Sequence, residues 1–208
     1  MPRTGGAERV TRETTIRASV DIDGTGAATI DTGLGFLDHL FELLARHALI
    51  DLELTARGDL HVDAHHTAED CGLLLGRALD GALAERAGIR RYGAARLPMD
   101  EALADCALDV SGRFYADIAP RPSATDGRDE WLELVPHMLE ALAREAGLTV
   151  HLEVTKARSV HHHCEAMVKA FARALREAIE PDPRLAALDQ SRSGSTPAAV
   201  PSTKGVLR

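Results

Sequence analysis

Two segments of this chain each begin with adjacent histidines and carry a glutamate four residues after the first of them. They read HHTAEDCGLLLGRAL at residues 65–79 and HHHCEAMVKAFARAL at residues 161–175, 96 positions later. In a helix, residues i and i+4 lie on one face, so His65 can act with Glu69, and His161 with Glu165. Imidazole nitrogens and carboxylate oxygens are ligands for manganese, iron, cobalt and zinc. The repeated pattern therefore predicts two related metal sites.

The second histidine of each pair predicts that two different ions are bound. Adjacent helical residues diverge by about 100°, so His65 and His66 do not chelate one ion from the same helix. The same holds for His161 and His162. We therefore expect two ions, each with ligands from both segments. His61 and Asp63 precede the first pair and are expected to orient its ligands.

Sequence similarity upstream of the histidine pairs extends the repeat. HLFELLAR at 39–46 matches HMLEALAR at 137–144, and VDIDGTG at 20–26 matches LDVSGRF at 108–114. His39 and His137 thus begin equivalent helical segments and are expected to complete the two metal sites. The chain divides into a first half-repeat at 1–92, a second at 93–180, and a tail at 181–208 that carries PSTKG.

Periodicity gives each half the order strand pair, helix, strand, helix. In the first half the turn 23–26 predicts a hairpin between two alternating strands. Helix 35–47 has an apolar stripe at Leu37, Leu40, Phe41 and Leu44. The expected elements are strands 14–22, 27–31 and 52–56 with helices 35–47 and 65–86, then strands 106–110, 114–118 and 149–155 with helices 130–146 and 161–179. We expect an α/β (α+β) fold of two duplicated halves, each a small sheet with two helices on one face.

Composition excludes several classes of protein. The net charge of −8 argues against nucleic-acid binding, which needs a basic surface. No apolar run approaches the roughly 20 residues that cross a bilayer, and MPRTGGAERV lacks the apolar stretch of a signal peptide. The three cysteines do not form a disulfide framework and are expected to be buried thiols in a reducing cytosol. A cytoplasmic protein without nucleic-acid or membrane partners is expected.

Six motifs of the sequence resemble those of a known family. GFLDHLFELLARH, GDLHVDAHHTAED, RRYGAARLPMDEAL, LDVSGR, HHHCEAMVKAFARAL and the terminal PSTKG are similar, in order, to motifs of imidazoleglycerol-phosphate dehydratase. The resemblance covers nearly the whole chain and is more specific than any single motif. It implies a cytosolic manganese enzyme of histidine biosynthesis with a duplicated fold like domain 2 of ribosomal protein S5. It also implies a homo-oligomer, an octahedral cage of 24 subunits with active sites between subunits.

Carried over by motif, the resemblance implies a role for each of three groups of residues. The metal ligands are the residues that the repeat had already selected, namely His39, His65, His66, Glu69, His137, His161, His162 and Glu165. The substrate phosphate is bound by Arg91, Arg113, Lys169, Ser202 and Lys204. Glu13 lies near the substrate as a proton-transfer group, and the acid and base are chosen among Glu13, Glu69 and Glu165.

The sequence departs from the family pattern at a few positions. Ala157 and Ser159 stand where the family has glycine and asparagine, Val168 replaces a phenylalanine, and 138–140 replaces an aromatic pair and a glutamine. The tail before PSTKG is longer than usual, and the chain has no phosphatase domain.

The implied reaction is the dehydration of imidazole glycerol phosphate to imidazole acetol phosphate. The hydrogen that is lost sits on a carbon without a carbonyl, so its acidity is low. Two ions at the two ring nitrogens would convert the substrate to an imidazolate. That ring would expel the adjacent hydroxyl to form a diazafulvene, and a carboxylate would remove the proton. Two alternatives are a dinuclear metal-dependent hydrolase and a non-catalytic metal-binding cage.

Overall fold

The computed structural model describes residues 2–119, 129–185, 200–203 and 207. It contains two series of elements that follow the same order. The first comprises β1 (Thr4–Val10), β2 (Thr14–Asp21), β3 (Ala28–Asp31), α1 (Gly35–Ala48), β4 (Asp51–Gly58) and α2 (His65–Leu83). The second comprises β5 (Tyr92–Met99), β6 (Ala102–Asp109), β7 (Tyr115–Ala119), α3 (Trp131–Glu145), β8 (Thr149–Lys156) and α4 (Val160–Ile179).

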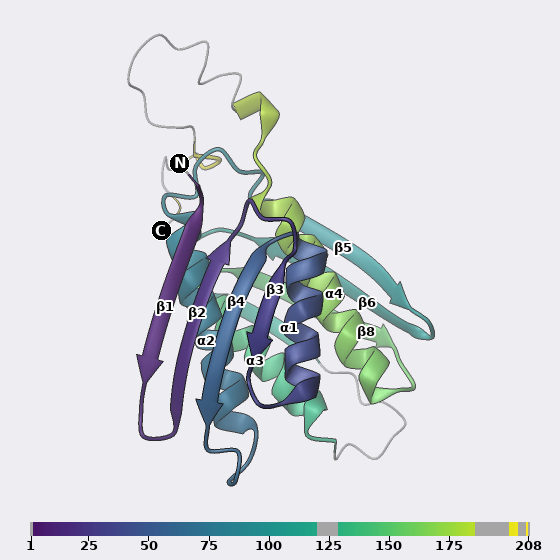
Figure 1. Ribbon diagram of the computed structural model, residues 1–208. Helices are drawn as coiled ribbons and strands as arrows, with labels where there is room; N and C mark the ends of the chain where they lie inside the picture. Colours follow the sequence, from purple (N-terminus) through teal and green to yellow (C-terminus); the bar gives the residue numbers. More distant parts are fainter. Residues whose placement is uncertain (1, 120–128, 186–199, 204–206, 208) are drawn as a thin grey trace.

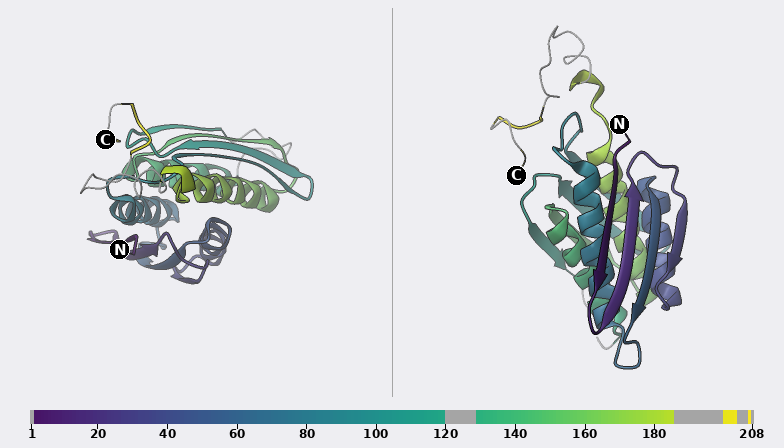
Figure 2. Two further views of the ribbon diagram at one scale, coloured as in Figure 1. Left: turned by 90° about the horizontal axis from the view of Figure 1, so that it is seen from above. Right: turned by 60° about the vertical axis from the view of Figure 1, so that its left-hand side comes forward.

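The two series form two four-stranded sheets with the helices between them (Figure 1). The sheets have the equivalent strand orders β1-β2-β4-β3 and β5-β6-β8-β7. Seen from above, one sheet lies on each side of the helical layer (Figure 2). Helix α1 packs against α4, and α2 packs against α3, so each helix of one half contacts a helix of the other. One aliphatic core therefore runs through both halves.

The predicted α/β duplication is confirmed, and so is the apolar stripe of the first helix. Leu37, Leu40, Phe41 and Leu44 are all buried on α1. The predicted division of the chain after residue 92 stays a prediction, because the two halves share one core.

The predicted hairpin around residues 23–26 is wrong. Strands β2 and β3 do not pair with each other, because β4 lies between them, antiparallel to β2 and parallel to β3. The carboxylate of Asp51, the first residue of β4, accepts hydrogen bonds from the backbone N–H groups of Thr25 and Ala27, at 2.7 and 2.9 Å. Neighbouring strands lie about 5 Å apart, so the loop 22–27 is long enough to cross the roughly 10 Å from β2 over β4 to β3.

The edge strands β1 and β5 were not predicted from the sequence. Each carries a glycine against the helix that covers its sheet. A Cβ atom on Gly5 would lie 1.9 Å from the carbonyl oxygen of Ala78, and one on Gly93 would lie 1.9 Å from that of Ala174. A glycine in a strand often marks such a close approach of two backbones. The same contact in both halves extends the repeat to the first strand of each sheet.

This close approach gives a stability prediction. We expect Gly5→Ala to lower the free energy of unfolding by about 1–3 kcal/mol, because the added methyl group forces β1 away from α2. The neighbouring Gly6→Ala is the control, since its Cβ would lie 3.6 Å from the nearest atom, the carbonyl oxygen of Ala18. That variant should remain within about 0.5 kcal/mol of the parent in urea unfolding. Equal losses in the two variants would contradict the packing argument.

Helix α2 ends three residues earlier than the sequence predicted. Ala84 and Arg86 have positive φ angles of 45° and 52°, which stop the helix after Leu83. The reversal buries the Arg86 side chain, which donates to the carbonyl oxygens of Ala84 and Ala146 at 3.3 and 3.1 Å. Arg86 thus binds the C-terminal ends of two helices, one from each half.

The described cysteines and helices agree with the expectations from composition. Cys71, Cys106 and Cys164 are free and buried. Among the helices that the structure describes, none combines the length and apolar character needed to span a membrane. Residues 120–128 and most of the tail lie outside the described residues.

Candidate metal centres

The first candidate centre joins α1 to α4. His39 of α1 and His161 of α4 both place Nε2 against Oε1 of Glu165, at 2.8 and 2.7 Å. The two imidazole rings stack at 5.8 Å between centroids, and Glu165 is buried. His161 and Glu165 share one face of α4, as their i, i+4 spacing predicted. The three ligand atoms lie within 4.8 Å of one another.

The second candidate centre joins α2 to α3 in the equivalent way. His65 and Glu69 lie one turn apart on α2, and His137 approaches them from α3. The rings of His65 and His137 stack at 4.9 Å between centroids. His137 Nε2 lies 3.3 Å from Oε1 of Glu69. Each centre therefore takes ligand atoms from both halves of the chain.

An unsatisfied imidazole nitrogen in the second centre fits a metal ion. His137 Nε2 is buried, and it has no hydrogen-bond partner within the described part of the chain although Glu69 is close. A buried polar atom without a partner is costly. Two imidazoles and a carboxylate are also a donor set that divalent transition metals accept. The residues of both centres thus fit a bound ion.

Close helix packing positions the second centre. His65, Glu69, Gly72 and Gly76 follow one another at the i, i+4, i+7 and i+11 positions of a single α2 face. A Cβ on Gly72 would lie 2.4 Å from the carbonyl oxygen of Met138, and one on Gly76 would meet α3 just as closely. The two glycines therefore let the backbones approach beside His137.

His66 and His162, also predicted as ligands, lie outside both three-residue centres of the single chain. Their rings are perpendicular to those of the preceding histidines, with centroids 6.2 and 6.0 Å apart. His66 Nδ1 lies 3.1 Å from a carboxylate oxygen of Asp59, and His162 Nδ1 lies 2.7 Å from one of Glu101. These hydrogen bonds raise the pKa of both imidazoles and hold the pKa of Glu101 at about 2.

The sequence did not identify Asp59 and Glu101. It had suggested His61 and Asp63, but the Asp63 carboxylate instead accepts the backbone N–H of His65 at 2.8 Å. An acidic residue in GDLH or MDE has no periodic relation to a histidine, so only tertiary contacts reveal the pairing.

Lys169, predicted to bind phosphate, lies beside the first centre. Its Nζ pairs with Oε2 of Glu165 and also contacts Met99 Sδ at 3.3 Å. Burial raises the pKa of Glu165, but hydrogen bonds from Lys169, His39 and His161 outweigh that effect and lower the pKa to about 2. Glu165 is therefore an ionised carboxylate surrounded by nitrogen donors.

Arg91 and Ser202 lie together, far from the first centre. The Arg91 guanidinium forms a two-pronged contact with Asp109 at 2.7 and 3.0 Å and donates to the Pro201 carbonyl at 2.7 Å. Its backbone N–H bonds to Ala178, near the end of α4, whereas His161 lies at the start. At 1.5 Å per residue, these ends are about 25 Å apart.

Of the other two predicted phosphate ligands, Arg113 and Lys204, the structure describes only Arg113. Arg113 is exposed in the loop after β6, where its carbonyl accepts hydrogen bonds from Ser111 and Thr149 at 3.2 Å each. Lys204 lies outside the described residues. The phosphate-binding role of all five residues stays a prediction.

Glu13 lies at the tip of the β1–β2 hairpin, and a buried network fixes that tip to α2. Its negative charge helps raise the pKa of His66, so the two residues are near each other. Behind Glu13, Thr14 donates to the buried Asp70 carboxylate at 2.5 Å, and Arg9 pairs with the same carboxylate at 2.9 Å. Asp70 directly follows Glu69, so the network links the hairpin to the second centre.

The Ser159 departure from the family pattern has a structural role. Its side chain caps α4 by accepting the backbone N–H of His162 at 3.4 Å. Serine is a favourable N-cap residue, so the helix that carries the second histidine pair still has a defined start.

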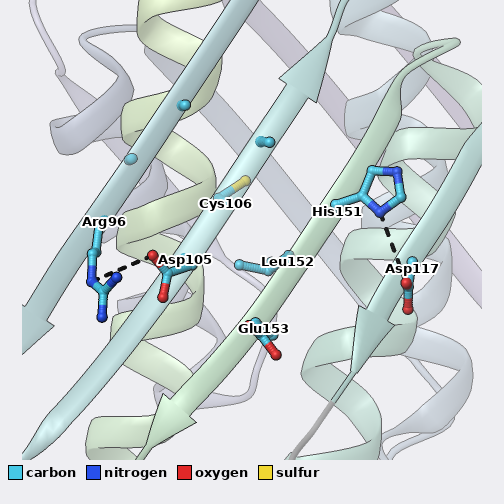
Figure 3. A pocket seen from close by; sticks show the side chains of 10 residues that line it. Arg96, Asp105, Cys106, Asp117, His151, Leu152 and Glu153 are labelled. Atoms are coloured by element: carbon cyan, nitrogen blue, oxygen red, sulfur yellow. Dashed lines mark ion pairs between the residues drawn. The ribbon is translucent and has the colours of Figure 1, made fainter.

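A hollow on the outer face of the second sheet is separate from both centres. Its volume is about 560 Å³, and it is lined by residues of β5 to β8 (Figure 3). Arg96 pairs there with Asp105 at 3.6 Å, and His151 with Asp117 at 3.8 Å. None of the centre residues lines it. The two groups of potential metal ligands lie between helices instead.

Comparisons with known proteins point to one family. A family model described as imidazoleglycerol-phosphate dehydratase matches residues 32–175. A relative of that name from Cereibacter sphaeroides is 50% identical over 200 residues, which cover 96% of each chain. One from Acidiphilium cryptum is 47% identical over 208 residues and the whole of both chains.

Two solved structures share the fold. The crystal structure of the Staphylococcus aureus imidazoleglycerol-phosphate dehydratase has a TM-score of 0.74 and 31% identity, over 86% of this chain and 99% of that one. The Pyrococcus furiosus enzyme, solved in complex with (S)-C348, has a TM-score of 0.77 and 32% identity, over 97% and 100% of the two chains.

Proposed function

Because this chain belongs to the imidazoleglycerol-phosphate dehydratase family, we propose that it catalyses the family reaction with two manganese ions held by its histidine centres. The reaction removes water from imidazole glycerol phosphate in histidine biosynthesis. One observation carries the metal proposal: two equivalent sets of two imidazoles and one carboxylate, each within 4.8 Å. Iron, cobalt or zinc could use the same donors.

Such ions would activate the imidazole ring of the substrate as Lewis acids. Ions held by the two histidine centres would lower the pKa of the substrate imidazole and would thereby favour loss of the hydroxyl on the adjacent carbon. This chain's own residues have other tasks. Glu165 holds Nε2 of His39 and of His161 by hydrogen bonds, Glu69 lies 3.3 Å from Nε2 of His137, and Glu13 presents a carboxylate on a fixed hairpin for proton transfer.

The separation of the predicted site residues supports an assembly in which neighbouring copies complete each active site. Arg91 and Ser202 lie about 25 Å along α4 from His161, far beyond the length of a glycerol phosphate. His66 and His162 also belong to neither three-residue centre of their own chain. We therefore propose a homo-oligomer, the octahedral 24-mer, in which these residues act in a neighbour's site.

An assay with controlled metal content tests the proposed function. We expect dehydration of imidazole glycerol phosphate to disappear after exhaustive chelation and to return with manganese, because the ring is not activated without it. Light scattering of the same samples would measure the assembly. A metal hydrolase would instead release inorganic phosphate, and a storage cage would bind manganese without turnover. Full activity after chelation would contradict the metal proposal.

The tail gives a separate prediction. We expect Lys204→Ala to raise the KM for substrate roughly tenfold to hundredfold, because a hydrogen bond to a charged group contributes about 1.5–3 kcal/mol. Manganese content should stay at the parent value, which elemental analysis would measure. Lys156→Ala, on an exposed position of β8, is the matched control. An unchanged KM would remove the tail from the substrate site.

A further inference from the structure

The second histidine of each pair contacts one carboxylate, and in both halves the contact is made through the ring atom Nδ1. Glu101 contacts Nδ1 of His162, and Asp59 contacts Nδ1 of His66. An ionised carboxylate only accepts hydrogen bonds, so Nδ1 carries a proton, and in the neutral ring the lone pair therefore lies on Nε2. The exposed Asp100 carboxylate lies 3.9 Å from His162 Nε2, beyond hydrogen-bond distance. Both rings are therefore held in the tautomer that offers Nε2 as a ligand.

These two carboxylates are not equivalents in the repeat, so the duplication does not explain the shared contact. Glu101 directly precedes β6, as Glu13 directly precedes β2, and each lies in the hairpin that follows an equivalent glycine-bearing edge strand. Glu13 and Glu101 are thus the matching pair. In the first half, Asp59 from another loop contacts the histidine and leaves Glu13 exposed. The same contact has arisen from two different loops.

We propose that Glu101 and Asp59 are positioning residues that fix His162 and His66 as Nε2 ligands, an inference that rests on the metal function proposed above. Ligand histidines in metal sites generally donate their other ring N–H to a carboxylate or carbonyl, and loss of that partner weakens metal binding 10- to 100-fold. The role is positional, because neither carboxylate belongs to the two three-residue centres.

The hydrogen bonds of the two carboxylates differ, so replacing each carboxylate with its amide should affect the histidine tautomer differently. Oε1 of Glu101 accepts the backbone N–H groups of Arg158 and Ser159 at 3.2 and 3.0 Å, while Oε2 takes His162. In Glu101→Gln the amide oxygen must face the two N–H donors, so the amide nitrogen faces His162. That nitrogen donates to Nδ1 and moves the ring proton to Nε2, which removes the ligand lone pair.

Asp59 has one free oxygen. Its Oδ1 is buried without a hydrogen-bond partner among the described residues, and Oδ2 faces His66. In Asp59→Asn the amide oxygen can keep the contact with His66, and the amide nitrogen takes the free position. The histidine tautomer is then retained.

The experiment measures manganese affinity of the full-length variants by electron paramagnetic resonance titration, alongside unfolding of the metal-free proteins. We expect Glu101→Gln to weaken binding at one of the two sites 10- to 100-fold, with an unchanged metal-free unfolding midpoint. Asp59→Asn should lose less than about tenfold. Glu101→Asp keeps an acceptor-only carboxylate, so it should bind more tightly than Glu101→Gln and serves if the latter folds poorly. Saturating manganese should restore most of the kcat of Glu101→Gln.

Parent affinity in Glu101→Gln, or equal losses in Glu101→Gln and Asp59→Asn, would overturn the proposal. Manganese binding by the parent protein distinguishes failure of the proposed function from failure of the positioning role. If the parent protein binds manganese and Glu101→Gln weakens that binding, the positioning role holds even when neither protein dehydrates the substrate. If the parent protein binds no manganese, the metal function and the positioning role both fall.

Discussion

Replacing His161 with alanine should lower kcat/KM by at least about three orders of magnitude. The change removes one of the three proposed ligand groups that meet between α1 and α4, where both imidazoles contact Glu165 at 2.7–2.8 Å. Metal-assisted steps supply several kcal/mol of transition-state stabilisation, and each 1.36 kcal/mol is a factor of ten in rate. Steady-state kinetics of the purified variant would measure the loss of kcat/KM, and elemental analysis would measure the loss of bound metal.

The matched control for this variant is His151→Ala. His151 is exposed near Asp117 on the outer face of the second sheet, opposite the face that the helices cover (Figure 3). That variant should keep its activity and metal within about twofold, since surface substitutions change stability by about 0.5 kcal/mol or less. We also expect His161→Ala to weaken the assembly. Full activity and an intact assembly in His161→Ala would refute the ligand assignment.

Gly72→Ala should remove one of the two proposed metal ions and destabilise the fold. The added Cβ would lie 2.4 Å from the Met138 carbonyl oxygen, so α2 and α3 must separate beside His137. Overpacking of this kind costs about 1–3 kcal/mol, which lowers Tm by roughly 2–4 °C per kcal/mol in a chain of this size. The centre between α1 and α4 does not depend on this contact. The manganese content should therefore fall from two ions per chain to one.

Gly81→Ala in the same helix separates packing from helix propensity. Its Cβ would meet only the Cα of Gly5, at the ordinary contact distance of 3.7 Å. Alanine favours helix over glycine by about 0.8–1.0 kcal/mol, so this variant should be as stable as the parent or slightly more stable. Both variants are compared by calorimetry and metal analysis. Two bound ions in Gly72→Ala would show that the spacing of the helices does not control the second centre.

Local sequence signals predicted most of the helical layer. The stripe of Leu37, Leu40, Phe41 and Leu44 repeats at helical spacing and is buried as expected. The edge strands escaped prediction because β1 and β5 are partly exposed, lack clear apolar alternation and contain glycines that suggest loops. The misplaced hairpin has a related cause: strand pairing depends on β4, which lies 20 residues further along the chain than β3.

Helical geometry and the repeat predicted which residues come together in each candidate centre. The i, i+4 spacing put His161 with Glu165 on one face, and the repeat supplied His39 as a third group. The separation of His66 and His162 from these groups followed from the 100° angle between adjacent helical residues. The contacts with Asp59 and Glu101 could not be predicted, because they join a helix to loops that no periodic pattern connects to it.

The crossed pairing of the helices, α1 with α4 and α2 with α3, bears on the origin of the fold. It is the arrangement that two identical half-length chains would adopt about a two-fold axis, with each first helix against its partner's second. A single half of that kind would hold no complete set of ligands, whereas the symmetric dimer would hold two identical ones. Fusion of two such ancestors into one polypeptide would then have allowed the two sites to diverge separately.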